Sequence, residues 1–420
     1  MKGYKFLAVN VDVLATLIIF LASFVFYYLG CKELLASGFY QQINIAFDLD
    51  QSHFFYSVGH DVDTARVLLI KHPFIYLYNY IILPLNYIGL SDNISIILLS
   101  QLFHSGSLVI SYYIFRTVGR TTLESSLLTC GLAGTSTYIS SGFVLDVYSL
   151  SMFWIAAIFL IVSRAGYQNH ISLVWLRMII SVMAIGTTSY LIVLVILMEL
   201  FLANTFEEKI FNTFKSKLLY KQILRVFTLG AILFVMIYFQ VIIEIIQDPI
   251  AVLKRVFWTV NRPGDKEGIF QVITVFALFS ILSPKVSIIL LPEGITMIDL
   301  RAMDFNVLGW FIIIILMVSL FLKFNNKKHF YLLLFCLLWL AFNIIFHTIY
   351  QYRGSLFLYS GHMVLSVWII YFSSIENSTY KLNWFQGVYN KLDKILIYIM
   401  PILIWNNNLY LYQEINTLSW

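Results

Sequence analysis

The chain has 420 residues, of which 60% are hydrophobic and only 12% are charged. Soluble domains contain about 25% charged residues, so this composition excludes an ordinary soluble protein and favours one whose apolar surface lies in lipid. The net charge of +5 is spread along the chain without a basic tract, which argues against a nucleic-acid-binding protein. The three cysteines, Cys31, Cys130 and Cys336, are too few and too far apart to predict a disulfide framework or a zinc site.

Apolar runs long enough to cross about 30 Å of hydrocarbon recur along the chain, and the first lacks the cleavage site of a signal peptide. Two further stretches, 73–90 and 270–291, are interrupted by prolines, and we expect interfacial or re-entrant segments there. The predicted fold is all-α: one integral membrane domain, 1–420, forming a polytopic bundle of roughly 10–12 transmembrane helices. The predicted spans are 9–30, 95–115, 124–143, 147–163, 171–187, 189–204, 222–243, 307–322, 330–349, 356–373 and 395–412, and 171–187 with 189–204 also fits one long bent helix.

The placement of Lys and Arg predicts how the chain is oriented, because cytoplasmic loops carry an excess of both. An N-terminus on the cytoplasmic side puts most of them inside, including Arg116, Arg120 and the basic group at 209–225. The first loop, 31–94, and a second long segment, 244–306, then share the outer face. Both segments mix charges, aromatic residues and short apolar stretches, so we expect folded caps with interfacial helices rather than linkers.

The first outer loop holds the densest cluster of ionisable side chains in the chain. Asp48 and Asp50 come soon after the first helix, and a carboxylate held at the membrane surface can act as a general base toward a hydroxyl. Arg66 and Lys71, followed directly by His72, are cations that can hold a phosphate leaving group. The alternative interpretation is a solvated loop whose charges serve solubility.

The same loop also contains His53 and His60, which together with the acids and His72 include the residue types that bind metals. Their spacing matches no established ligand pattern, so we predict no metal site, and a divalent ion stays an alternative. Since the chain also lacks a phosphate-cradling glycine loop, we expect no bound cofactor.

Asp146 and Tyr148 lie between two closely spaced helices in the segment FVLDVYSLSMFW. The acid is a candidate for the substrate pocket. It is equally well placed to cap the helix that follows, and the two roles can coexist.

A third polar group surrounds an outer turn at 346–368. Arg353 is the only Asp, Glu, Lys or Arg between Lys328 and Glu376, and an arginine so near the membrane is costly unless it is paired. Its alternative role is to reach lipid headgroups. The pocket candidates around it are His347, Tyr352, Tyr359 and His362, the last of which could instead form a hydrogen bond between helices.

These segments resemble the bacterial polytopic glycosyltransferases of the GT-C type. FDLDQSHFFYSVGH and ARVLLIKHPFIYLYN are similar to the family's first outer loop, in which an acidic motif follows the first helix and a His-Pro motif opens the next apolar segment. VLDVYSLSMFW resembles a later acidic-Tyr-Ser motif, with Asp146 where the family usually has Glu. AIGTTSYLIVLV resembles a central glycine-threonine helix, and IFHTIYQYRGSLFLYSGHM a late helix pair with a Tyr-Ser-x-His stretch facing the donor lipid.

The low charge, the Ile, Phe and Tyr bias and the length also resemble the serotype-converting O-antigen glucosyltransferases of enteric bacteria and their phages. The resemblance implies a multi-pass protein of the bacterial inner membrane whose active site faces the periplasm. It implies transfer of a sugar, such as glucose, from a polyprenyl-phosphate donor to a surface polysaccharide. Asp48 or Asp50 would then act on the acceptor hydroxyl, and Arg353, with Lys71 or Arg66, would neutralise the departing phosphate. The expected partners are lipid, donor and acceptor, with a separate donor-synthesis enzyme and a flippase.

Three other functions stay open at the level of sequence. An O-antigen polymerase would share the membrane, the face and the lipid donor. A transporter would be expected to have internal repeats and ionisable residues near the bilayer midplane, whereas Glu199 lies toward the inner end of its helix. A membrane acyltransferase would need a histidine within a helix pair, for which His104 and His347 are the candidates.

Overall fold

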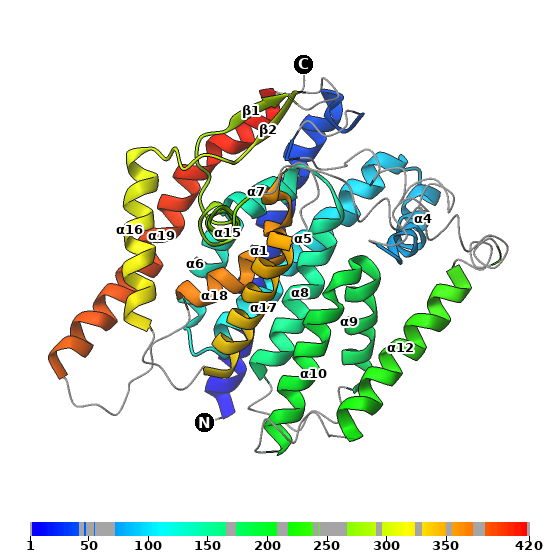
Figure 1. The fold of residues 1–420 in the computed structure, drawn as a ribbon, viewed down its shortest axis with the longest axis horizontal. Helices are drawn as coiled ribbons and strands as arrows, with labels where there is room; N and C mark the ends of the chain where they lie inside the picture. Colours follow the sequence, from blue (N-terminus) through cyan, green and yellow to red (C-terminus); the bar gives the residue numbers. More distant parts are fainter. Residues whose placement is uncertain are drawn as a thin grey trace.

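The chain forms a mostly helical structure, as the apolar runs predict (Figure 1). Six of the predicted site residues lie outside the part that is described: Asp48, Asp50, Arg66, Lys71, Tyr352 and Arg353. The computed structural model describes residues 2–41, 46–47, 54, 72–164, 174–207, 217–237, 243, 267–290, 296–323, 330–349, 355–372 and 383–417.

Within these residues, five helices are long and apolar enough to cross a membrane. They are α1 (Lys2–Ala36), α5 (Asp92–Thr117), α8 (Val147–Arg164), α17 (Phe330–Ile349) and α19 (Asn383–Thr417). Other predicted spans form α9 (Val174–Thr187), α10 (Ile192–Glu207), α12 (Lys217–Ile237) and α16 (Val307–Lys323). The structure thus supports a polytopic membrane protein.

α5 lies at the centre of the bundle and packs against both α1 and α8. Its buried side chains include His104 and many serines, while α1 leaves Leu14, Leu17 and Leu21 half-exposed. Figure 1 shows α16 beside α19 at one edge of the molecule and α12 at the opposite edge. An exposed leucine face on α1 is expected for a helix that borders lipid.

Two of the predicted spans each form two shorter helical segments, so the prediction of one continuous helix is wrong for both. The stretch 124–143 forms α6 (Thr122–Ala133) and α7 (Ser136–Phe143). At the break, a Cβ on Gly134 would lie 2.6 Å from the ring of Trp405, and Thr135 caps α7 by accepting from the backbone N–H of Tyr138. The stretch 356–373 forms the 3₁₀ helix η7 (Leu356–His362) and α18 (Val364–Phe372).

The close pair 171–187 and 189–204 forms two helices, not one bent helix. Thr188 adopts an extended conformation after α9, and the 3₁₀ turn η5 (Ser189–Leu191) leads into α10. Thr188 is held in place by a 2.6 Å hydrogen bond between its hydroxyl and that of Ser151 on α8. The chain therefore reverses here at a defined polar contact.

Neither proline-interrupted stretch forms a long helix, and the expectation that they are interfacial or re-entrant stays a prediction. The first contains the 3₁₀ turn η3 (Ile75–Tyr78) and α4 (Asn79–Tyr87). The second contains α15 (Ile269–Thr274), the π-helical turn η6 (Val275–Phe279) and the strand β1 (Ser287–Leu290). β1 pairs antiparallel with β2 (Thr296–Asp299), so the all-α prediction missed a two-stranded sheet.

Buried ion pairs connect helices away from this sheet. Arg177 on α9 lies 2.5 Å from Glu199 on α10, and both side chains are buried. Arg120, after α5, pairs with Asp393 on α19 and donates to the carbonyl oxygen of Phe372. Because Glu199 pairs with Arg177, a structural role explains why this acid is buried. This weakens the transporter interpretation.

Candidate functional site

The candidate site surrounds η7, where His362 ends the 3₁₀ helix. The His362 ring lies between two tyrosines, with centroid distances of 4.8 Å to Tyr148 on α8 and 4.9 Å to Tyr190 on η5. The side chain is only 2% exposed, and neither ring nitrogen has a hydrogen-bond partner among the described residues. A buried polar group without a partner is uncommon and calls for a ligand, a water or a catalytic role.

His347 lies beside the same aromatic group. It comes from the last turn of α17, and its ring centroid is 4.1 Å from that of Tyr359 on η7 and 5.4 Å from that of Phe276 on η6. Tyr190 contacts both histidines, with its centroid 6.1 Å from that of His347. The predicted pocket residues His347, Tyr359, His362 and Tyr148 are therefore brought together by α8, η5, η6, η7 and α17.

His72 opens the His-Pro segment and is fixed to the end of α9. Its Nδ1 lies 2.7 Å from the carbonyl oxygen of Thr187, and the backbone N–H of Phe74 donates to the carbonyl oxygen of Gly186. Gly186 is required by this contact, because a Cβ there would lie 1.9 Å from the Phe74 ring. The glycine-threonine segment is thus the docking point of the segment that begins at His72.

Tyr78 forms further hydrogen bonds at this docking point. Its hydroxyl accepts a 2.7 Å hydrogen bond from the indole N–H of Trp154 and lies 2.6 Å from the hydroxyl of Thr187. Burial raises the pKa of Tyr78 to about 12. The protonated phenol has a single hydrogen, which is free to be donated to Thr187.

Electrostatics keep His362 neutral. η7 is not among the five helices that are long and apolar enough to cross a membrane, and its last residue is buried. Burial lowers the pKa of His362 well below its ordinary value, and the neighbouring His347 and His72 lower it further. A neutral imidazole carries one N–H donor and one acceptor nitrogen, which suits hydroxyl groups rather than anions.

Asp146 lies just before α8 and is 9% exposed. Its Oδ1 accepts a 2.5 Å hydrogen bond from the backbone N–H of Val147, and its carbonyl oxygen accepts from Ser149. These contacts support the capping role at the start of α8. The first turn of α8 packs against η7, where a Cβ on Gly361 would lie 3.2 Å from the side chain of Tyr148.

Phe47, which borders the catalytic candidates of the first loop, also contacts η7. Phe47, which precedes Asp48 in the chain, donates its N–H to the carbonyl oxygen of Ile298 and places its ring 4.9 Å from that of Phe357. Phe47 also has a φ of 55°, unusual for a residue with a side chain. It lines a cavity of about 10 Å³ together with Tyr148 and Ser360, which is room for a single water molecule.

Ser355 follows Arg353 by two residues and is tied to the sheet. Its hydroxyl donates to Asp299, and it accepts from the N–H of Phe357 at 3.0 Å. Asp299 is 1% exposed and accepts a 2.8 Å hydrogen bond from Arg301. The start of η7 is thus held by a buried carboxylate from β2.

Tyr190 and Asp299 were not among the site residues predicted from the sequence. Tyr190 lies in the segment AIGTTSYLIVLV, so the resemblance could have identified it. Asp299 had no such signal, because its role depends on a strand that the sequence did not predict. Among the described residues, no group of three or more His, Cys, Asp and Glu could hold a metal ion, which leaves the expectation for the remaining residues untested.

No protein-family model matches the chain, and no curated protein matches it at a significant level.

Proposed function

We propose that the chain is a membrane glycosyltransferase. It moves a sugar, such as glucose, from a polyprenyl-phosphate donor to a surface polysaccharide or O-antigen on the periplasmic face of a bacterial inner membrane. One observation carries the proposal: Phe47 and Ser355, which border the segments that hold Asp48, Asp50 and Arg353, both contact Phe357 of η7. His72, which follows Lys71, is bonded to Thr187 at the end of α9, just before Tyr190 in the chain. Segments distant in sequence therefore approach one group of buried polar and aromatic side chains.

The chemistry is a single displacement at the anomeric carbon of the sugar. Asp48 or Asp50 accepts the proton of the acceptor hydroxyl as its oxygen forms the new bond to carbon. The bond between that carbon and the phosphate oxygen breaks, and the electron pair leaves with polyprenyl phosphate. Arg353, with Lys71 or Arg66, neutralises the departing charge, and the configuration inverts.

The described residues would position the sugar. Neutral His362 and the hydroxyl of Tyr190 offer hydrogen-bonding groups without a partner among the described residues. The rings of Tyr148 and Tyr190 contact the His362 ring, and the ring of Tyr359 contacts that of His347. An apolar pocket with few placed polar groups is typical of small-molecule sites. Since the cavity beside Phe47 holds about 10 Å³, the sugar and donor would enter only if η7 and the first loop separate.

The experiment compares surface polysaccharide from cells that produce the chain with that from cells that lack it, by mass spectrometry and NMR. The transferase predicts that a single side-branch sugar disappears while chain length is kept. Collapse of long chains to single repeat units would indicate a polymerase instead. Unchanged polysaccharide in both strains would contradict a role in either reaction.

A further inference from the structure

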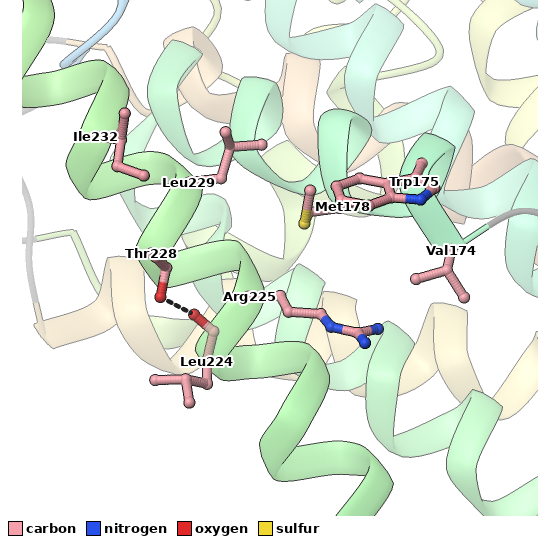
Figure 2. A pocket seen from close by; sticks show the side chains of 8 residues that line it. All are labelled: Val174, Trp175, Met178, Leu224, Arg225, Thr228, Leu229 and Ile232. Atoms are coloured by element: carbon pink, nitrogen blue, oxygen red, sulfur yellow. Dashed lines mark hydrogen bonds between the residues drawn. The ribbon is translucent and has the colours of Figure 1, made fainter.

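An apolar groove lies between the first turns of α9 and the middle of α12, with a volume of about 450 Å³ (Figure 2). Most of its lining is hydrophobic, including Trp175 and Met178 from α9 and Leu224 and Leu229 from α12. This volume falls within the roughly 300–1,000 Å³ of ordinary ligand pockets. Met178 from the groove lining also belongs to a small apolar cluster with Val182 and Val226, through which α12 packs on α9.

The groove opens to the outside of the bundle. Trp175 is 73% exposed and Leu224 67% exposed. Such large apolar side chains are unfavourable in water and suited to a membrane, and tryptophan is enriched at the level of lipid headgroups. The surroundings of the groove are therefore expected to be lipid.

Arg225 is the charged residue of the groove lining. Figure 2 shows its side chain extending from α12 toward α9. In the described part of the chain no ion pair includes Arg225, whereas Arg177 on α9 is paired with Glu199. Thr228, the other polar lining residue, donates its hydroxyl to the carbonyl oxygen of Leu224 at 2.8 Å, so it needs no ligand.

A guanidinium without an ion-pair partner among the described residues, beside apolar surface, is complementary to a molecule with a phosphate and a hydrocarbon chain. Arginine binds phosphate through two parallel N–H donors, and such bonds are stronger where water is scarce. We propose that this groove binds a glycerophospholipid, with an acyl chain between α9 and α12 and the phosphate on Arg225.

The position of the groove distinguishes this lipid from the proposed sugar donor. Val174 begins α9 and Thr187, which holds His72, ends it, so the two sites are about 20 Å apart along the helix at 1.5 Å per residue. The groove therefore lies toward the opposite leaflet from the candidate site. The proposal does not depend on the proposed sugar transfer.

The test measures binding of phosphatidylglycerol to the purified full chain in detergent by native mass spectrometry. Arg225→Gln is expected to weaken binding at least tenfold, because the phosphate loses its partner. Lys221→Gln is the matched control: it removes an exposed charge one turn earlier on α12, outside the groove, and should change binding less than twofold. Thr228→Trp fills the groove without altering charge and should weaken binding to a similar degree as Arg225→Gln.

Two further lipids separate the alternatives. Diacylglycerol, which lacks the phosphate, should bind the wild-type chain and Arg225→Gln equally weakly. Equal phosphatidylglycerol binding by wild type and Arg225→Gln would overturn the proposal, as would an equal loss in Lys221→Gln. Preferential binding of polyprenyl phosphate at this groove would also overturn it, since the occupant would then be the donor lipid.

Discussion

The rings of Tyr190 and His362 stand nearly perpendicular, at 88°, with centroids 4.9 Å apart. The Tyr190 hydroxyl and both His362 nitrogens are buried without a hydrogen-bond partner among the described residues. Leaving such groups unpaired is costly, so they are the described groups whose substitution tests the proposed contact with a sugar most directly.

Tyr190→Phe separates this role from a structural one. Removing a buried, unpaired hydroxyl should leave the thermal unfolding midpoint unchanged or slightly higher. Sugar transfer should fall about tenfold, the equivalent of roughly 1.4 kcal/mol of lost transition-state binding. Tyr220→Phe, at an exposed position on α12, should alter neither quantity. Full transfer activity in Tyr190→Phe would show that the hydroxyl does not contact substrate.

The buried His362 makes the stability of the fold depend on pH. Because the pKa of His362 is lowered in the folded state, folding favours its neutral form. The stabilisation is complete above the ordinary pKa of 6.5 and is lost as the pH falls below it. The unfolding midpoint should therefore drop between pH 7.5 and pH 5, and His362→Leu should show a smaller drop. An identical drop in both proteins would assign the effect to other groups, such as His347 or His72.

Gly186→Ala tests the docking of the segment that contains His72 and Phe74 on α9. The added methyl group would lie 1.9 Å from the Phe74 ring, so the His72 segment must move. We expect a loss of about 1–3 kcal/mol in stability together with reduced transfer. Gly230→Ala is the control, since nothing lies within 4 Å of a Cβ at that helical position. It should stabilise α12 by about 0.5–1 kcal/mol. Equal unfolding midpoints for the two variants would contradict the close contact.

The pair Arg177–Glu199 should behave as a buried structural ion pair. Glu199→Gln alone should destabilise the protein by about 3–5 kcal/mol, because Arg177 would keep an uncompensated charge. Arg177→Met combined with Glu199→Met should recover most of that loss, as measured by the unfolding midpoint in detergent. A double variant less stable than Glu199→Gln would contradict this account, because the ion pair would then stabilise the fold more than apolar side chains can.

The sequence predicts the helices because apolar runs of sufficient length have few other structures available in a membrane protein. The break at Gly134 could not be predicted, since the residues on both sides suit a continuous helix and the contact with Trp405 is distant in sequence. The sheet of β1 and β2 was missed for a similar reason. Its eight residues in two short strands have too little periodicity to distinguish them from a helix segment.

The candidate site was predictable in part. His347, Tyr359 and His362 lie close in sequence around one turn, so their proximity follows from the turn itself. Their contact with Tyr190 depends on how α9 and α10 pack, which local patterns do not specify. Asp146 was interpreted both as a cap and as a pocket residue. Its hydrogen bond to Val147 supports the first role, and the second stays a prediction.

The most direct test of the proposed function compares surface polysaccharide from cells carrying the wild-type chain, Asp48→Asn, Asp50→Asn or the control Asp61→Asn, with equal protein in the membrane. A catalytic base contributes about 10²–10⁴-fold to rate. We predict that one of the first two variants loses the side-branch sugar by mass spectrometry and NMR, while Asp61→Asn keeps it. Wild-type polysaccharide from both Asp48→Asn and Asp50→Asn would contradict the assignment of the catalytic base to this loop.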